Sequence, residues 1–282
     1  MVVDLKNGKS TVSIGICAYN EEANISKLLD SILAQELSRV TIIEIIVVSS
    51  NSSDSTDQIV EDYSKRDNRI SLITEEQRNG KASAVNLFLQ RASGEICIIQ
   101  SADTICIAKT IESICSPILG DPNVGAVGGR PIPRGTRGIF LPFANRLIWH
   151  LHSRVSMRNP KLGEISAHRN IIDSIPLDAT SDDTYLEYAI KEKGLKVEYS
   201  HDAVIYNQGP DTLSEYIEQR TRWRGAQIRV QKDTGYVSAS GKQRSVNYEV
   251  ARYCLFRPWT IPFVFPICFI ELYCISRAKR ML

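Results

Sequence analysis

Short apolar runs alternate with segments of helical periodicity along the first part of the chain. The runs at residues 12–18, 42–48, 70–74 and 96–104 are rich in β-branched side chains and have the length of buried strands. Between the first two, apolar residues recur over 25–33 at the spacing of an amphipathic helix. This alternation predicts an α/β fold with a mostly parallel sheet and helices on its faces.

The alternation continues beyond residue 104 with longer elements. We expect a helix from about residue 108, a strand at 124–129 and a second helix over 140–155. Residues 196–199 and 203–206 predict a strand pair or one extended segment. A chain of 282 residues with 43% hydrophobic side chains can form one large α/β domain with an appended subdomain.

Polar residues follow the strands, at the edge where an open α/β sheet binds its ligand. Asp103 lies near the end of the run at 96–104, and a carboxylate there can hold a divalent cation on the phosphates of a nucleotide. An Asp turn that only caps the strand is the alternative. Tyr19 and Glu21 follow the first strand, where a ring can stack on a base and an acidic group can meet the sugar. For Tyr19, a half-buried turn aromatic is a competing interpretation.

Two further polar turns fit a nucleotide. Ser49 and Ser50 begin a hydroxyl-rich loop that can contact the base, or can simply cap the next helix. Gly80 allows close approach of the backbone, and Lys81 puts a positive charge at a helix start, where a phosphate would lie. A lone Gly-Lys pair is a weak signal, and its place before the strand that leads to Asp103 strengthens it.

Two motifs in the second half carry candidate chemistry. Asp182 and Asp183 lie at a helix start, where they can cap the helix or act as a general base on an attacking hydroxyl. Gln219 and Arg222 fall on one face of a later helix. Arg222 can neutralise a departing diphosphate, and Trp223 can form a flat floor for a sugar or a lipid headgroup.

Charge and cysteine content limit the partners. Thirty-four basic and 32 acidic residues give a net charge of +2, too small for bulk attraction to nucleic acid. Seven cysteines without a Cys-x-x-Cys pair predict neither a disulfide framework nor a zinc site, and fit reduced core residues of a cytosolic protein. The N-terminal residues lack an apolar signal core, so we expect no signal peptide.

A basic stretch suggests contact with a membrane surface. Residues 122–163 contain no acidic residue, and the amphipathic helix within them carries Trp149. This combination is typical of an interfacial helix on a membrane. A helix packed on the sheet, with a solvated basic face, is the alternative.

The C-terminal tail points the same way. Residues 255–275 are mostly apolar and are followed by basic residues, but only 17 residues run from Trp259 to Ile275, with Pro262, Pro266 and Glu271 among them, which is short for a membrane span. We expect an interfacial or re-entrant segment. Docking on the protein's own surface, or on a partner protein, is the alternative.

The order of these motifs resembles that of the family 2 glycosyltransferases, over roughly residues 11–230. The resemblance implies the GT-A type of Rossmann-like fold, a nucleotide-diphosphate sugar as donor, Mn²⁺ or Mg²⁺ as cofactor, and inversion at the sugar carbon. Membrane-linked and processive members of that family carry a Gln-x-x-Arg-Trp motif. The matching features are Tyr-Asn-Glu at 19–21, Gly-Lys at 80–81, Ala-Asp at 102–103, the acidic pair at 182–183 and Gln-x-x-Arg-Trp at 219–223.

The resemblance also implies roles for the acidic residues. Asp183 is the expected catalytic base, with Asp182 in place of the family's Glu beside it, and Asp103 is the expected metal ligand. The family usually has Asp-Ala-Asp where this chain has Ser101 before Ala102, so one carboxylate is missing and substrate oxygens and water would complete the coordination. The family commonly has a base-reading Asp where this chain has serines, which leaves the choice of base open.

The remaining roles concern the two substrates. Arg222 is expected at the donor diphosphate, and Gln219, Trp223 and His168 at the acceptor. The expected nucleotide-binding residues are Ala18, Tyr19, Glu21, Ser49, Ser50, Lys81, Ser101 and Ala102.

Together these observations predict an inverting glycosyltransferase that acts at the cytoplasmic face of the cell membrane. Its acceptor would be a hydroxyl or phosphate group, lipid-linked or on a glycan, and no nucleic acid is expected as a partner. The expected organisation is a nucleotide-sugar half at 1–110, an acceptor-binding and catalytic half at 111–235, and a membrane-interfacial segment at 236–282. A polysaccharide synthase-like enzyme and an inactive nucleotide-sugar-binding or scaffold protein stay open as alternatives.

Overall fold

A curled eight-stranded sheet forms the centre of the computed structural model, which describes residues 8–135 and 138–281. The segment on which the expected lack of a signal peptide rests falls largely outside these ranges. The strand order is β3-β2-β1-β4-β7-β6-β8-β5. The strands are β1 (Ser10–Ala18), β2 (Val40–Ser49), β3 (Ile70–Thr74), β4 (Ile96–Ser101), β5 (Thr104–Cys106), β6 (Val124–Arg134), β7 (Ile165–Arg169) and β8 (Lys196–Gln208).

The sheet is mostly parallel, as the alternation of elements predicts. β1 pairs in parallel with β2 and β4, β2 with β3, and β6 with β8. The exceptions are β7, which is antiparallel to β4 and β6, and β5, which is antiparallel to β8. The sheet continues across residue 110, so the first two expected units share it.

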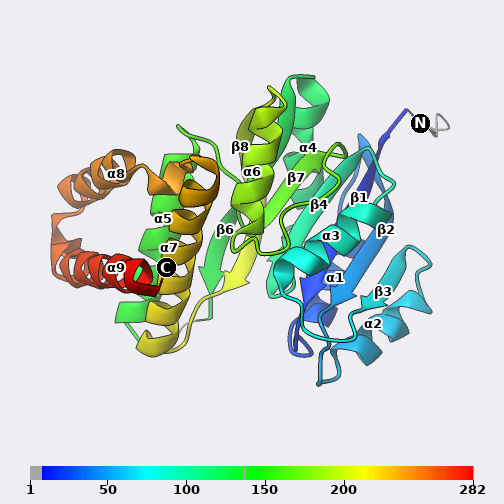
Figure 1. Ribbon diagram of the computed structural model, residues 1–282, viewed down its shortest axis with the longest axis horizontal. Helices are drawn as coiled ribbons and strands as arrows, with labels where there is room; N and C mark the ends of the chain where they lie inside the picture. The colour runs from blue at the N-terminus through cyan, green and yellow to red at the C-terminus, as the bar shows by residue number, and fades with distance from the viewer. Residues whose placement is uncertain (1–7, 136–137, 282) are drawn as a thin grey trace.

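Helices cover both faces of the sheet (Figure 1). They are α1 (Ile25–Leu33), α2 (Thr56–Ser64), α3 (Lys81–Arg91), α4 (Thr110–Gly120), α5 (Phe140–Ser156), α6 (Asp182–Glu192), α7 (Leu213–Thr234), α8 (Gln243–Phe256) and α9 (Ile261–Met281), with short 3₁₀ turns η1 (Ala239–Gly241) and η2 (Pro258–Thr260).

The apolar run of β4 is explained by burial on both sides. Ile96 and Ile98 pack into one core with α1, α2 and α4, whereas Cys97 and Ile99 pack into a second core with α3 and α6. A strand covered on both faces needs apolar side chains at every position, which removes the period-two pattern of a half-exposed strand.

Two segments differ in detail from the expectation. The run at 96–104 is two strands, because β4 ends at Ser101 and a turn at Ala102 and Asp103 separates it from β5. The turn residues leave the hydrogen-bonded ladder, so Asp103 lies at the edge of the sheet. The segments at 196–199 and 203–206 form the single strand β8, which follows β6 through a register shift.

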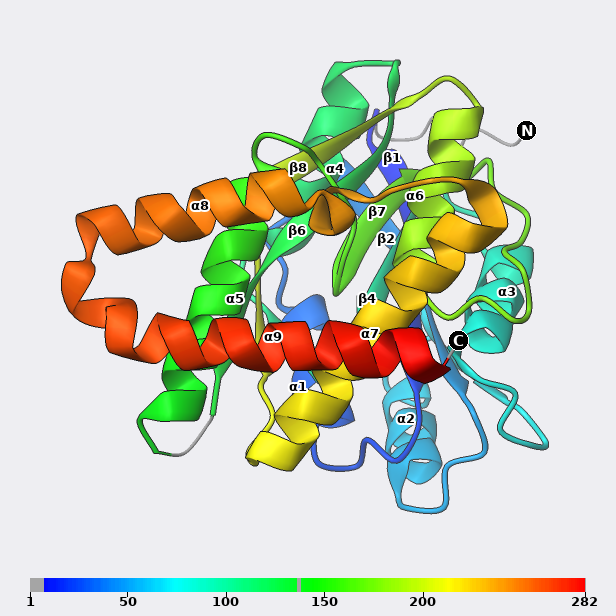
Figure 2. The same cartoon turned by 60° about the vertical axis from the view of Figure 1, so that its left-hand side comes forward.

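The C-terminal segment forms a pair of helices, α8 and α9, that packs against α5 and α7 (Figure 2). Tyr216 of α7 is fully buried there, together with Leu147 of α5 and with Val264 and Ile267 of α9. Helix α9 continues through Pro266, which has no backbone N–H to donate.

Residues Pro258–Met281 have a mean hydropathy of 1.6 and form one helix that is long and apolar enough to cross a membrane, by length and composition only. This helical stretch is longer than the apolar tail seen in the sequence. A helix of this length and composition is compatible with a membrane span and also with an interfacial helix, so the length does not distinguish them.

Candidate active site

A cavity of about 1060 Å³ lies at the carboxyl edge of the sheet and extends beneath α5, α7, α8 and α9. It brings together residues that are far apart in the sequence. Most of the candidate residues line it, namely Ala18, Tyr19, Glu21, Ser50, Lys81, Ser101, Ala102, Asp103, Asp182, Asp183, Gln219, Arg222 and Trp223.

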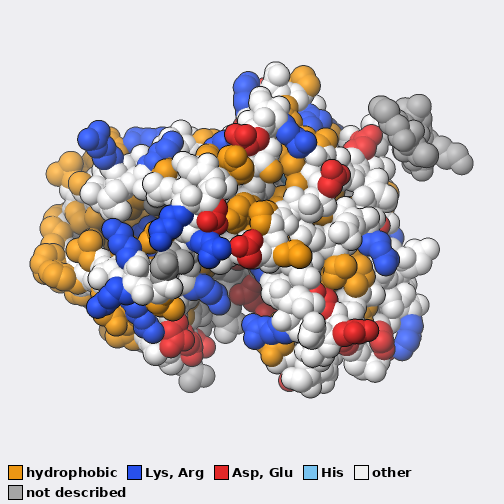
Figure 3. Space-filling model, viewed as in Figure 1, with side chains coloured by type: hydrophobic (Ala, Val, Ile, Leu, Met, Phe, Trp, Pro, Cys, Tyr) orange, Lys and Arg blue, Asp and Glu red, His pale blue; other side chains and the backbone are white. Residues whose placement is uncertain are grey.

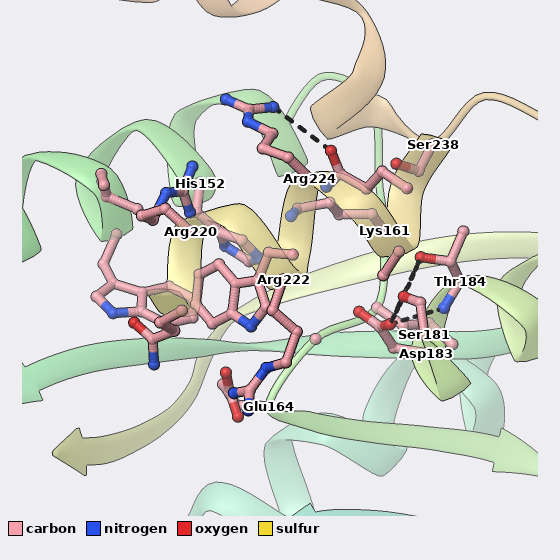
Figure 4. A pocket seen from close by; sticks show the side chains of 18 of the residues that line it. His152, Lys161, Glu164, Ser181, Asp183, Thr184, Arg220, Arg222, Arg224 and Ser238 are labelled. Atoms are coloured by element: carbon pink, nitrogen blue, oxygen red, sulfur yellow. Dashed lines mark hydrogen bonds between the residues drawn. The ribbon is translucent and has the colours of Figure 1, made fainter. Parts of the chain in front are cut away.

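Asp183 lies in the first turn of α6 with one carboxylate oxygen held and the other available. Oδ1 accepts hydrogen bonds from the Ser181 hydroxyl at 2.5 Å and from the Thr184 N–H at 2.8 Å (Figure 4). Oδ2 accepts no hydrogen bond from any described residue. The side chain is therefore fixed in orientation, and it presents a free acceptor to the cavity, as a general base requires.

Asp182 connects the two halves of the site. Its Oδ2 lies 3.0 Å from Nζ of Lys81, the first residue of α3. Burial opposes the charge of Lys81, but Asp182, with help from Glu164 and Asp183, holds the pKa of Lys81 above its usual range. Lys81 is thus positively charged, and it is already paired with Asp182 rather than free for a phosphate. We call the edge of the sheet around Lys81, Ser101 and Asp103, where the sequence predicts the sugar donor, the donor edge.

A second carboxylate lies near Asp103 and was not among the expected residues. Glu164 directly precedes β7, lines the same cavity, and accepts a hydrogen bond of 2.9 Å from the Ser101 hydroxyl. Burial and the charge of Asp103 raise the pKa of Glu164 to about 7. Burial, together with Glu21, also raises the pKa of Asp103. The donor edge therefore concentrates negative charge.

The turn after β1 carries an aromatic ring with a cation over it. The guanidinium carbon of Arg78 lies 3.9 Å from the centre of the Tyr19 ring, and both residues line the cavity. A base that stacks on Tyr19 would have to displace or share this contact. Arg78 was not among the expected residues. The only hint of it in the sequence is that a second basic residue stands shortly before Gly80 and Lys81.

The serine loop after β2 is mostly occupied by its own hydrogen bonds. Ser49 is fully buried, donates to Ser52 and does not line the cavity. Ser50 lines the cavity and donates to the buried carboxylate of Glu75 at 2.7 Å. Of the two, only Ser50 is placed where a nucleotide could reach it.

Helix α7 delivers the Gln-x-x-Arg-Trp motif to the cavity. Gln219, Arg222 and Trp223 all line it, so the helix face expected from their spacing is the one that faces the site. Trp223 meets Trp149 of α5 edge-on, with ring centres 5.6 Å apart. Trp149 is only 8% exposed, so it belongs to the cavity wall and is not the membrane anchor that the sequence suggested.

His168 is not at the site. It is fully buried on β7, its Nδ1 lies 2.9 Å from the carbonyl oxygen of Arg169, and it does not line the cavity. Because β7 runs away from the edge, His168 lies several residues into the sheet from Glu164. The expected contact of His168 with an acceptor is therefore wrong.

The donor set at the edge fits a hard divalent cation. No cluster of three or more His, Cys, Asp or Glu side chains arranged for a metal occurs within the described ranges. Mg²⁺ and Mn²⁺ need fewer protein ligands than that, since they bind through one or two carboxylates and take phosphate and water oxygens for the rest. Asp103 and Glu164 are the residues that could hold such a cation.

The fold is a Rossmann-like α/β fold, and the cavity lies at the carboxyl edge of its sheet, where open α/β sheets bind their ligands. Residues 13–172 match the family model of Glycosyl transferase family 2. The match covers more than half of the chain, so the chain belongs to this family.

Curated relatives agree with this family. The chain is 26% identical over 242 residues to the probable glycosyltransferase YdaM of Bacillus subtilis (strain 168), which covers 78% of this chain and 56% of YdaM. It is 24% identical over 220 residues to the poly-beta-1,6-N-acetyl-D-glucosamine synthase of Staphylococcus aureus (strain COL), covering 74% of this chain and 52% of the synthase. The chain thus spans about half the length of the curated relatives it matches.

Solved structures show the same GT-A fold. The mannosyltransferase PcManGT from Pyrobaculum calidifontis, in complex with GDP-Man and Mn²⁺, matches with a TM-score of 0.70 and 21% identity, over 96% of this chain and 87% of that one. S. aureus TarS 1–349 in complex with UDP matches with a TM-score of 0.52 and 16% identity, over 89% and 74%. At these identities the likeness establishes the fold alone.

Proposed function

We propose that this protein is an inverting, divalent-cation-dependent glycosyltransferase that transfers a sugar from a nucleotide diphosphate to a lipid-linked acceptor at the cytoplasmic membrane face. The observation that carries the proposal is the extent of the cavity. It joins the carboxylates of the donor edge to Asp183 and then continues between apolar side chains of α8 and α9.

The catalytic step is a single in-line displacement at the sugar carbon. The free Oδ2 of Asp183 takes the proton of the acceptor hydroxyl, while Ser181 and Thr184 hold Oδ1. Arg222, on the neighbouring face of the cavity, offsets charge on the departing diphosphate. A divalent cation at Asp103 supplies Lewis-acid stabilisation of that diphosphate when it is bound.

The inner end of the cavity is suited to an apolar chain. Val250 and Val246 of α8 line it opposite Val264, Ile267 and Leu272 of α9. Val264 and Ile267 are already buried against α7, whereas Leu272 is 63% exposed, so a lipid tail lying along α9 would remove the Leu272 side chain from water. The acceptor's headgroup would then lie near Trp223 and Asp183.

The donor site is supported by the nucleotides of the structural neighbours. PcManGT holds GDP-Man with Mn²⁺, and TarS 1–349 holds UDP or UDP-GlcNAc. The two neighbours differ in their base, and here Ser50, in the loop that follows β2, donates a hydrogen bond to Glu75, which directly follows β3. We therefore leave the base to experiment.

The test begins with binding of UDP, GDP, CDP and dTDP to the purified chain by calorimetry, each with and without Mn²⁺. The corresponding sugar nucleotides are then assayed for release of nucleoside diphosphate with a polyprenyl phosphate or glycolipid acceptor. Asp183→Asn should lower turnover by about a thousandfold or more, and leave nucleotide binding within a few-fold, because only the proton acceptor is lost. Loss of binding together with activity would assign Asp183 a structural role instead.

Asp178→Asn is the matched control for that substitution. Asp178 lies in the loop just before α6, is 71% exposed at its side chain, pairs with Arg229, and does not line the cavity. It should keep both binding and turnover. If no nucleotide bound, with or without Mn²⁺, the interpretation as an inactive scaffold protein would replace the interpretation as an enzyme.

A polysaccharide synthase-like enzyme is the second candidate. The match to the poly-beta-1,6-N-acetyl-D-glucosamine synthase favours it, although this chain spans 52% of that relative. Product length separates the two: a single transferred sugar supports the present proposal, and a ladder of oligomers supports a polymerising enzyme.

A further inference from the structure

Ser101 breaks the acidic pair expected at the donor edge. The family resemblance places a carboxylate on both sides of Ala102, and this chain has one only at Asp103. A neutral hydroxyl adds no charge to a site for a hard divalent cation, which prefers carboxylate ligands. A site of normal strength therefore needs a second carboxylate from another part of the chain.

Glu164 lies where that carboxylate is missing. The Ser101 N–H donates to the carbonyl oxygen of Glu164 at 3.1 Å, which continues the antiparallel pairing of β4 with β7 by one step. Residues directly opposite each other on neighbouring strands project to the same face. The Ser101 hydroxyl accordingly donates to Oε2 of Glu164 at 2.9 Å, so this carboxylate lies directly beside the side chain of residue 101.

The carboxylates of Glu164 and Asp103 favour the binding of a cation from solution. Glu164 and Asp103 line the same cavity and raise each other's energy when both are charged. Neither forms an ion pair with any residue of 8–135 or 138–281, and the nearby Lys81 is bound to Asp182. Two neighbouring carboxylates without a cation repel each other, and a divalent ion between them removes that repulsion.

We propose that Glu164 supplies the second carboxylate of the divalent-cation site, so that Glu164 on the β7 side and Asp103 after β4 together replace the acidic pair that Ser101 interrupts. The inference rests on the proposed function, because the cation is expected to bind with the nucleotide diphosphate. Ser101 retains a positioning role. Its hydroxyl donates to Oε2 of Glu164, and this hydrogen bond fixes the orientation of the whole carboxylate, including Oε1.

The test is Mn²⁺ binding, measured by the loss of the free-ion signal in electron paramagnetic resonance, with UDP and with GDP in separate titrations. Glu164→Gln keeps the shape and removes the charge, and we expect it to weaken Mn²⁺ binding on the order of tenfold or more. Asp103→Asn should weaken it comparably. Adding Ser101→Asp to Glu164→Gln returns a carboxylate to the same place from the opposite strand, and should restore most of the affinity.

Glu218→Gln is the charge-matched control, because Glu218 is exposed on α7 and outside the cavity. Equal Mn²⁺ affinity in the wild type and in folded Glu164→Gln would overturn this inference and leave the proposed function intact. If the wild type fails to bind Mn²⁺ with UDP and GDP, the titration is repeated with CDP and dTDP, and failure with all four nucleotides would overturn both. If Glu164→Gln does not fold, Glu164→Asp withdraws the carboxylate by one methylene, and unchanged affinity in that variant counts equally against Glu164.

Discussion

Gly128 lies where β6 passes under the segment that leads to Glu164. A Cβ atom built on Gly128 would lie 2.1 Å from the carbonyl oxygen of Lys161, which is backbone and cannot rotate away. Lys161 lines the cavity, so a shift of this backbone would also move the wall of the site. The absence of a side chain at 128 is therefore a condition for the geometry of the cavity around the candidate catalytic residues.

We expect Gly128→Ala to lower the free energy of unfolding by about 1–3 kcal/mol or more, since overpacking against backbone forces the chain to move. Urea denaturation followed by circular dichroism measures this change. Gly120→Ala is the control, because a Cβ there meets nothing within 4 Å and lies at the end of α4. That control should be neutral or slightly stabilising, and an equal loss in both variants would contradict the steric explanation.

The candidate residues that the sequence identified share one property, which is that their signal is local. Asp183 and Arg222 stand at motif positions, and their neighbours in the chain are also their neighbours in the cavity. Glu164 could not be predicted in this way, because it becomes a candidate only through its contact with Ser101, which is 63 residues away in the sequence. The resemblance placed His168 at the acceptor, but β7 carries His168 away from the sheet edge, and the direction of a strand cannot be read from composition.

At the scale of elements, a buried ionic cluster fixes helix α9 to α7, the helix that carries the Gln-x-x-Arg-Trp motif. Glu271 of α9 lies 2.5 Å from Arg220 and 2.8 Å from Arg224, both on α7, and all three side chains are at most 16% exposed. Arg220 also lies over the ring of Trp223, with 5.1 Å between the guanidinium carbon and the ring centre. The position of the motif on α7 is therefore linked to the docking of α9.

Glu271→Gln should leave two buried guanidinium groups without their shared counter-charge. Removing one partner of a buried ionic cluster costs about 3–5 kcal/mol, so we expect a clear loss in the free energy of unfolding and a protease-sensitive C-terminal segment. Glu218→Gln, an exposed position on α7, serves as the control. Equal denaturation curves for the two variants would show that the cluster does not hold α9 in place.

Element boundaries followed the sequence wherever periodicity was strong. The strand at 70–74 and the helix starting at Lys81 coincide with β3 and α3. The predictions failed where tertiary packing decides the outcome. The amphipathic helix at 140–155 was expected to present Trp149 to a membrane, whereas α5 buries Trp149 at 8% exposure.

The whole molecule is polar at one end and apolar at the other. The donor edge gathers carboxylates and Lys81, whereas the loop that joins α8 to α9 and the outer face of α9 expose large apolar side chains. Figure 3 shows hydrophobic side chains collected at the margin where α8 meets α9, with basic side chains nearby. Leu255 is 77% exposed, Phe256 66%, Trp259 72%, Phe265 63% and Phe269 58%. A patch of this kind on a single chain indicates a surface that another apolar phase covers.

Under the proposed function, a lipid bilayer is the phase that would cover this patch, because the cavity that holds Asp183 also reaches α8 and α9, which carry most of the patch. An acceptor lipid could then remain in the membrane by its tail while its headgroup reaches the base. We expect the protein to co-sediment with vesicles that contain anionic lipid, and salt to weaken the binding, since basic side chains border the patch.

Replacing Trp259 and Phe265 by Ser should lower the vesicle affinity by on the order of a hundredfold, because each buried aromatic contributes about 1.5 kcal/mol or more. Leu177→Ser, at a residue that is 71% exposed in the loop before α6, removes an apolar side chain from another surface and should leave vesicle binding unchanged.

The double variant should still bind the donor nucleotide, since neither residue lines the cavity. Transfer to a short, water-soluble acceptor should survive as well, whereas transfer to a vesicle-embedded acceptor should fall with the affinity. If both variants bound vesicles like the wild type, the patch would have to be covered by a protein partner, and the lipid-linked acceptor would lose its main support.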